Sequence, residues 1–149
     1  MKPIALGSDP NAGELKEVLK KHLTALGYPW QDYGSDDPIY ANVAIEVAEA
    51  VAAGHHDRGI LLCGTGIGVC IAANKVQGAR AALCADAYSA ERAVKSNNAN
   101  IMTLGAQVTG PELAKSMVTV WLQAEYVTGT RSEPKVRRID DYEKGRAVS

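Results

Sequence analysis

Short apolar segments alternate with amphipathic, helix-like segments along almost the whole chain. Amphipathic spacing is clearest at about residues 12–26, where leucine and valine recur every three or four positions on one helix face. The expected strands lie at about residues 3–8, 28–33, 59–62, 80–84 and 100–105, and the helices at about 12–26, 40–53, 67–76, 87–95 and 111–125. Regular alternation of this kind predicts an α/β fold with a parallel sheet and helices on both faces.

A change in composition separates the C-terminal segment from this pattern. Residues 127–149 are polar and partly basic, and a short helix is predicted to end at about Lys144. We therefore expect one Rossmann-like, three-layer domain over residues 1–149, with a five-stranded parallel sheet and a C-terminal helical arm. The arm is either a solvated tail, as terminal charge clusters usually are, or a cationic segment that closes on an anionic ligand.

Composition excludes several classes of partner. The chain is 46% hydrophobic with a net charge of −1, and it has no basic cluster before the arm, so no nucleic-acid partner is expected. No segment reaches membrane-spanning length and no charged-then-apolar leader precedes the first strand, so we expect no membrane partner and a cytoplasmic location. Cys63, Cys70 and Cys84 lie in apolar runs and suit reduced thiols. No metal is expected, because neither the cysteines nor the three histidines have metal-ligand spacing.

The segment around Cys63 is the candidate functional site. Cys63 follows the apolar run at 59–62 and opens the sequence Cys-Gly-Thr-Gly-Ile-Gly, and a helix is predicted to begin at Ile67. The N-terminus of such a helix offers unpaired N–H groups and the positive end of its dipole to a ligand that is, or becomes, negative. Ligands of parallel sheets bind beyond the carboxyl ends of the strands. Asp9, Asp86 and residues 105–107 are predicted to lie at those ends, together with Cys63.

Each candidate residue also has a purely structural interpretation. Cys63 could be a buried apolar residue, because free cysteine is among the most buried residue types. Asp9 could cap the helix that follows it. Asn97 and Asn98 could simply end a helix, and Tyr40 could pack against a loop rather than line the site.

Residues 62–68, Leu-Cys-Gly-Thr-Gly-Ile-Gly, continue as Ile-Ala-Ala-Asn-Lys at 71–75. This sequence resembles the signature of ribose-5-phosphate isomerase B and of the related galactose-6-phosphate isomerase subunits. The cysteine and the Asn-Lys ending make it more specific than a bare GxGxxG motif. The resemblance covers essentially the whole chain, with further matches at residues 7–9, 88–90 and 110–115.

The resemblance implies a cofactor-free aldose–ketose isomerase that acts on a small phosphorylated sugar. It further implies a homodimer in which the partner chain completes each active site; whether dimers pair into tetramers stays open. The residue at Cys63 is then the base that moves a proton between adjacent carbons through an enediolate, and thiols at helix N-termini are readily deprotonated. The implied residues are Cys63 and Thr65 for catalysis, and Asp9, Gly64, Gly66, Ile67, Gly68, Asn97 of the partner chain, Arg131 and Lys135 for substrate binding.

The chain departs from the pattern of members that act on ribose 5-phosphate. Those members usually carry histidine at the positions of Pro10 and Ser96, and arginine at the position of Gln107. The imidazole that opens a sugar ring is therefore missing. The chain's own histidines lie outside any motif and are expected on the solvated surface. They are His22, His55 and His56.

The missing imidazole bears on the substrate. A four-carbon aldose phosphorylated at C4 cannot close into a furanose, so its isomerisation requires no ring-opening acid. The stretches at 89–92 and 96–99 also look like the family variant that interconverts D-erythrulose 4-phosphate and D-erythrose 4-phosphate. We favour that reaction over the family-typical conversion of ribose 5-phosphate to ribulose 5-phosphate. The replacement proton donor stays open between Thr65, Ser96 and a water molecule.

The same residues argue against two other classes of protein. A cysteine phosphatase would need arginine at position 69, which is valine, and a P-loop would need Lys-Ser/Thr after the glycine turn. A non-catalytic sugar-phosphate sensor is the remaining alternative. Such a sensor would keep the glycine turn and the tail cations but would tolerate the loss of Cys63.

Overall fold

The computed structural model describes the backbone of residues 1–148 and the side chains of residues 1–145. Residues 1–148 contain five strands and six α-helices, close to the predicted positions. The strands are β1 (Ile4–Ser8), β2 (Trp30–Asp32), β3 (Gly59–Cys63), β4 (Ala81–Leu83) and β5 (Ile101–Gly105). The α-helices are α1 (Gly13–Leu26), α2 (Tyr40–Ala52), α3 (Ile67–Ala73), α4 (Ala87–Lys95), α5 (Pro111–Gln123) and α6 (Glu133–Val148), and a 3-10 turn, η1 (Pro10–Ala12), precedes α1.

The five strands form one sheet in the order β2-β1-β3-β5-β4, and every neighbouring pair is parallel. The predicted α/β fold is therefore confirmed. The chain leaves β1 toward one edge of the sheet and later leaves β3 toward the other, which makes the crevice between the two strands a topological switch point. The register pairs Ser8 with Leu62 and Cys63 with Gly105, so the carboxyl ends of β1, β3 and β5 lie together.

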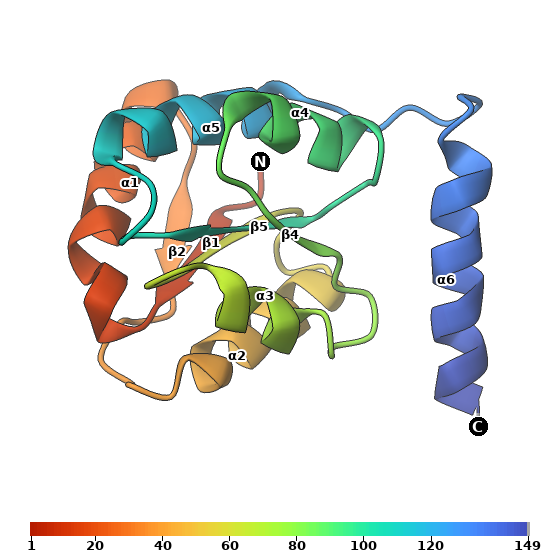
Figure 1. The fold of residues 1–149 in the computed structure, drawn as a ribbon, viewed down its shortest axis with the longest axis horizontal. Coiled ribbons are helices and arrows are strands. Elements are labelled where there is room, and N and C mark those ends of the chain that lie inside the picture. The colour runs from red at the N-terminus through yellow and green to blue at the C-terminus, as the bar shows by residue number, and fades with distance from the viewer. Residues whose placement is uncertain (149) are drawn as a thin grey trace.

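Two helical layers cover the sheet (Figure 1). Helices α1, α4 and α5 pack on one face, and α2 and α3 pack on the other. Strand β3 is buried over its whole length, as its continuous apolar run predicts. Because side chains alternate along a strand, Leu62 enters the core under α1, α4 and α5, whereas Cys63 enters the core under α2 and α3.

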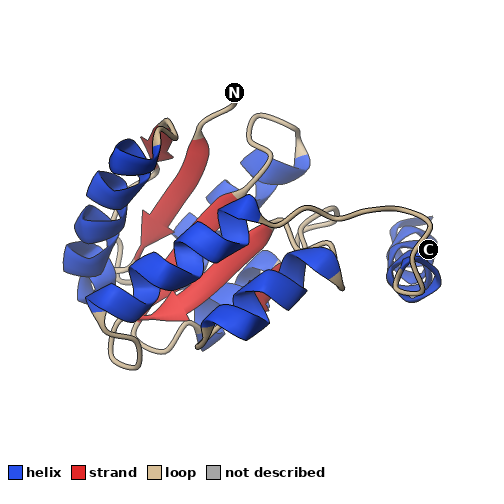
Figure 2. Cartoon of the chain, turned by 90° about the horizontal axis from the view of Figure 1, so that it is seen from above, coloured by secondary structure: helices blue, strands red, loops and turns tan. Residues whose placement is uncertain are grey.

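Helix α6 stands beside this three-layer body and is joined to it by an extended segment (Figures 1 and 2). Val136 is buried, and the Glu143 carboxylate accepts a hydrogen bond from Gly78 N at 3.2 Å. The helix is longer than the predicted short segment ending near Lys144, and Arg131 precedes it rather than lying on it. No helix in the described part of the chain has the length and apolar content needed to cross a membrane.

Candidate active site

The turn after β3 wraps around the sulfur of Cys63. Cys63 is 5% exposed, and its Sγ accepts a hydrogen bond from Gly66 N at 3.2 Å. Gly66 has a φ of +81°, a left-handed conformation that favours glycine, and α3 begins at the next residue. The thiol therefore sits at a helix N-terminus, where the sequence predicted it.

The turn is pressed directly against β5. A Cβ atom added to Gly105 would lie 2.5 Å from the carbonyl carbon of Thr65, and one added to Gly66 would lie 2.7 Å from that of Leu104. Backbone meets backbone at both points, so any side chain there would push the turn away from the sheet. The two glycines thus fix the position of the sulfur relative to the strand ends.

Thr65 is exposed at the tip of the turn, and its Oγ1 accepts a hydrogen bond from Ile67 N at 3.2 Å. The hydroxyl proton remains available to a ligand, because the oxygen acts as acceptor in that bond. Two of the backbone N–H groups expected to face an enediolate, those of Gly66 and Ile67, instead donate to side chains of the motif itself. Fewer backbone N–H groups of this turn are therefore free to bind an anion than the sequence suggested.

Three residues outside the motif hold the turn. The buried Thr103 hydroxyl donates to Gly66 O at 2.8 Å, Gln107 N donates to Gly64 O at 2.9 Å, and the Tyr40 ring lies against Gly68. Sequence reasoning missed the role of Thr103. The available signal was a lone polar residue in an otherwise apolar, buried strand.

A cavity of about 240 Å³ opens beside the turn, and Thr65, Ile67 and Gly105 contribute to its wall. Its lining is largely apolar and includes Cys84. Burial, followed by the nearby Asp86 and Cys70, raises the pKa of the Cys84 thiol to about 11. Cys84 is therefore protonated at neutral pH and does not compete with Cys63 as a nucleophile or base.

Asp9 lies across the switch point from Cys63, with its backbone N–H bonded to Leu62 O at 3.3 Å. The residue is 6% exposed, and its carboxylate accepts hydrogen bonds from Ala12 N and Asn11 Nδ2, both at 3.2 Å. Asp9 therefore caps the helical turn that follows it, as its position in the sequence allowed. Each carboxylate oxygen keeps acceptor capacity for a further donor.

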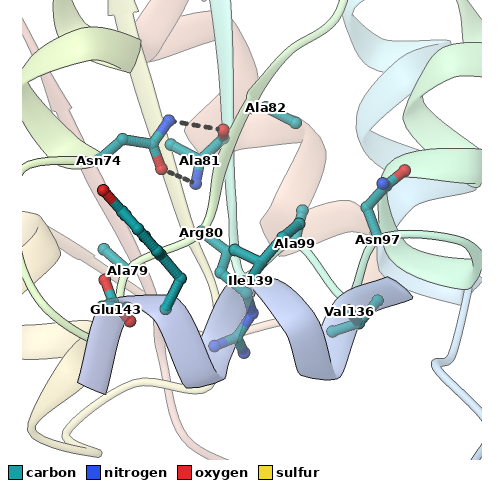
Figure 3. Close-up of a pocket in the computed structure, with 11 residues that line it drawn as sticks. Asn74, Ala79, Arg80, Ala81, Ala82, Asn97, Ala99, Val136, Ile139 and Glu143 are labelled. Carbon is teal, nitrogen blue, oxygen red and sulfur yellow. Dashed lines mark hydrogen bonds between the residues drawn. The ribbon is translucent and has the colours of Figure 1, made fainter. Parts of the chain in front are cut away.

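The other expected substrate-binding residues lie apart from the Cys63 turn. Asn97 lines a cavity of about 430 Å³ between the β4 edge and α6 (Figure 3). Arg131 lines a different cavity of about 280 Å³, and Lys135 is exposed on α6. One chain gathers residues 63–68 and Asp9 at the switch point but does not bring these three residues to the turn.

The prediction that the histidines lie on the solvated surface is wrong for His56, which is 2% exposed. Its Nδ1 bonds to Pro3 O and its Nε2 to the Tyr33 hydroxyl, each at 2.7 Å. Because the carbonyl can only accept, Nδ1 carries the proton and the tyrosine donates to Nε2. His56 therefore links three segments that are distant in sequence. In the described residues, no group of three or more potential metal-ligating side chains is present.

Comparison with known proteins identifies the family. A model of the family described as Ribose/Galactose Isomerase matches residues 4–139. This chain belongs to the ribose/galactose isomerase family. It is 52% identical over 147 residues to the D-erythrulose-4-phosphate isomerase of Pectobacterium atrosepticum, covering 96% of each protein. It is 45% identical over 144 residues to the ribose-5-P isomerase B of Listeria innocua, covering 95% of this chain and 97% of that protein.

Solved structures of this isomerase family share the fold. The ribose-5-phosphate isomerase B of Clostridium thermocellum superposes with a TM-score of 0.91 at 42% identity, covering 98% of this chain and 99% of that one. The type B ribose 5-phosphate isomerase of Trypanosoma brucei gives a TM-score of 0.90 at 35% identity, with coverages of 95% and 99%. The family and the enzyme class predicted from residues 62–75 are thereby confirmed: the chain is a sugar-phosphate aldose–ketose isomerase.

Proposed function

We propose that this isomerase interconverts D-erythrulose 4-phosphate and D-erythrose 4-phosphate, with Cys63 as the base. The observation that carries the proposal is the geometry of the turn, which holds the Cys63 sulfur 3.2 Å from Gly66 N at the start of α3. The sulfur therefore lies at the positive end of the α3 dipole, which also favours a substrate that becomes negatively charged. The 52% identical Pectobacterium relative, named D-erythrulose-4-phosphate isomerase, supports the choice of a four-carbon substrate.

The reaction needs only proton transfers. The Cys63 thiolate takes a proton from C1 of the ketose, the electron pair forms a C1–C2 double bond, and the carbonyl oxygen at C2 becomes negative. The C2 oxygen gains a proton and the C1 hydroxyl loses one as a carbonyl forms at C1, and the Cys63 thiol returns its proton to C2. The Thr65 hydroxyl, which keeps its proton when it accepts from Ile67 N, is suited to donate to the developing oxyanion. No electron or group leaves the substrate, so no cofactor is required.

The substrate preference rests on the residues that replace the missing imidazoles. Pro10 forms the first turn of η1, and the Ser96 hydroxyl accepts a hydrogen bond from Arg92 Nε at 2.9 Å. Neither group is an acid suited to opening a furanose ring, which an acyclic tetrose phosphate does not need. The family-typical pentose reaction is the second candidate, since the Listeria relative is named a ribose-5-P isomerase B.

We also propose a homodimer in which the partner chain brings Asn97, Arg131 and Lys135 to each Cys63 turn. The separation of these residues from the turn within one chain supports this arrangement. Large apolar side chains are also exposed on α3, β4, α4 and α6 and in the loop after β5, as is typical of surfaces that pack against another protein. They are Ile67, Ile71, Leu83, Tyr88, Val108, Ile139 and Tyr142.

A cytoplasmic location completes the proposal. Cys63, Cys70 and Cys84 are all free thiols, which suits a reducing compartment. The phosphorylated substrate class agrees with such a compartment, since charged sugar phosphates do not cross membranes unaided.

The testing experiment compares progress curves with D-erythrulose 4-phosphate and with D-ribulose 5-phosphate. Each curve is recorded for the wild-type protein and for Cys63→Ala. Cys70→Ala is the matched control, because it also removes one thiol, but one that donates to Ala81 O. We expect turnover of the four-carbon substrate, lost in Cys63→Ala by a factor of about 1,000 or more and retained in Cys70→Ala.

Efficient turnover of the pentose would refute the argument from the missing imidazoles. Cys63→Ala activity equal to the wild type would refute the assigned base. Binding of both sugar phosphates without any turnover would favour the sensor alternative.

A further inference from the structure

A basic hollow of about 280 Å³ lies between the C-terminal end of α4 and the segment that leads to α6. Its charged lining consists of Arg92, Lys95 and Arg131 with the single carboxylate of Glu125, and the hydroxyl residues Thr130 and Ser132 complete its polar wall. Glu91 lies 3.5 Å from Lys95 Nζ, so three cations face two carboxylates and the hollow keeps a net positive charge. The hollow is therefore suited to an anion that carries several oxygen acceptors.

Arg92 is held in place within the basic hollow. Its Nε donates to the Ser96 hydroxyl at 2.9 Å, one turn further along α4. Its only ion pair with a described residue is to Glu91 at 3.8 Å, which exceeds hydrogen-bond distance. The Nε bond consumes one edge donor, so the N–H groups on both Nη atoms stay available to a ligand.

The opposite wall of the hollow is a hydrogen-bonded turn. Ser132 N donates to Thr130 Oγ1 at 3.3 Å, and Glu133 N donates to Thr130 O at 3.2 Å. These bonds fix the backbone before α6, so Arg131 projects from a defined turn rather than from a free tail. The described carboxylates form no ion pair with Arg131.

We propose that Arg92 is a specificity-determining residue that binds the phosphate group of the sugar phosphate in the basic hollow, and that Ser96 positions it. This inference rests on the proposed isomerase function, in which Arg131 of the partner chain binds the substrate. Lys135 offers phosphate a point charge and Gln107 offers a neutral amide, so neither forms the two-pronged, charge-assisted bond of an arginine. Arg92 supplies a second planar guanidinium beside Arg131, and this guanidinium can form the two-pronged bond that Lys135 and Gln107 lack.

The C-terminal end of α4 contributes residues to two cavities. Ser96 fixes Arg92 toward the basic hollow, while the next residue, Asn97, lines the larger cavity toward α6.

The test combines phosphate binding with steady-state kinetics on the full-length protein. Inorganic phosphate is titrated by calorimetry into wild type, Arg92→Met, Arg92→Lys and Ser96→Ala, and kcat and KM are measured with D-erythrulose 4-phosphate. Lys21→Met, which removes an exposed lysine from α1, is the control for loss of one positive charge. We expect Arg92→Met to raise both the phosphate Kd and KM about tenfold with little change in kcat, because charge-assisted bonds of this kind act on binding.

We expect Arg92→Lys to recover part of the phosphate affinity. Ser96→Ala should raise the phosphate Kd and KM, as Arg92→Met does. Lys21→Met should match the wild type. Ser96→Ala removes one hydroxyl and keeps the test informative if Arg92→Met does not fold. Unchanged Kd and KM in Arg92→Met and Ser96→Ala would overturn the proposal. A raised phosphate Kd with an unchanged KM would overturn the assignment to the substrate and leave a separate site for a free anion. Absence of turnover in the wild type, with weaker phosphate binding in Arg92→Met, would instead refute the isomerase substrate while the anion site stands.

Discussion

The position of the Cys63 sulfur depends on a residue that carries no functional group. Gly105 ends β5, pairs with Cys63 across the sheet, and lies against the backbone of Thr65. Contact between two backbones cannot be relieved by a side-chain rotation. The position of the turn is thus set partly by a neighbouring strand that lies far from Cys63 along the chain.

We predict that Gly105→Ala lowers kcat/KM by about 100-fold, because the new Cβ, 2.5 Å from the Thr65 carbonyl carbon, displaces the turn. Gly110→Ala is the matched control, since nothing lies within 4 Å of a Cβ at that position. Kinetics with the four-carbon substrate and thermal unfolding are measured for both variants. Wild-type kinetics in a folded Gly105→Ala protein would show that the turn tolerates the shift.

Asp9 allows its two roles to be separated by substitution. Asparagine at this position would keep an oxygen for the Ala12 N–H and is as good a helix cap as aspartate, so we predict that Asp9→Asn leaves the free energy of unfolding nearly unchanged. If the carboxylate also accepts a substrate hydroxyl, kcat/KM falls about tenfold in the same variant. Asp9→Ala loses the cap as well and costs about 1 kcal/mol of stability. Urea unfolding and kinetics of both variants decide the matter, and a fully active Asp9→Asn protein would reduce Asp9 to a cap.

At the scale of whole elements, the sequence predicts the strands and helices well because each carries its own periodic signal. Strand β3 is a continuous apolar run, and α1 repeats its leucines on one face. The length of α6 lacked such a signal, since its few apolar residues, Val136 among them, are spread through a polar sequence. The burial of His56 could not be predicted either, because its partners Pro3 and Tyr33 come from distant segments.

The short edge strand β2 is attached to α1 by a buried ion pair. Lys16 is 1% exposed and its Nζ lies 2.7 Å from Asp32 Oδ1, while Lys20 Nζ lies 3.0 Å from Asp32 Oδ2. Burial raises the pKa of Asp32, but hydrogen bonds from Lys16, Gly34 N and Lys20 outweigh it and hold that pKa below its usual value. The folded state therefore favours ionised Asp32 more than the unfolded chain does.

The lowered pKa of Asp32 predicts that the protein loses stability on acidification. The stabilisation is complete above the unfolded carboxyl pKa of about 4 and is lost as the pH falls through the lower folded value. We expect Asp32→Asn to lower the free energy of unfolding by about 3 kcal/mol at pH 7, because Lys16 is left buried without its charged partner. Urea unfolding from pH 7 to pH 3 should show a gap between wild type and Asp32→Asn that narrows on acidification. The exposed Asp36 in the next loop supplies the control Asp36→Asn, and a gap that is constant with pH would contradict the prediction.

At the scale of the whole molecule, the site residues predicted from the sequence fall into two groups. The turn at 63–68 and Asp9 lie together at the switch point, as the strand order requires. Asn97 and Arg131 line other cavities, and no local pattern could have revealed that separation. A chain whose candidate site is divided in this way needs a second copy to assemble it, if both groups serve one reaction.

We predict that two variants, each impaired at low substrate concentration, recover activity when their subunits mix. In a heterodimer of Cys63→Ala and Arg131→Ala, one site receives a native turn from one chain and a native Arg131 from the other. Random exchange makes half of the dimers mixed, and one of the two sites in each is intact, so about a quarter of the sites recover. Subunits are exchanged in mild denaturant, heterodimers are counted by native mass spectrometry, and turnover is then measured. Cys63→Ala mixed with Gly105→Ala is the control and should recover nothing, because every site then contains one defective turn. Heterodimers that form without any recovery in the first mixture would mean that Arg131 serves the turn of its own chain.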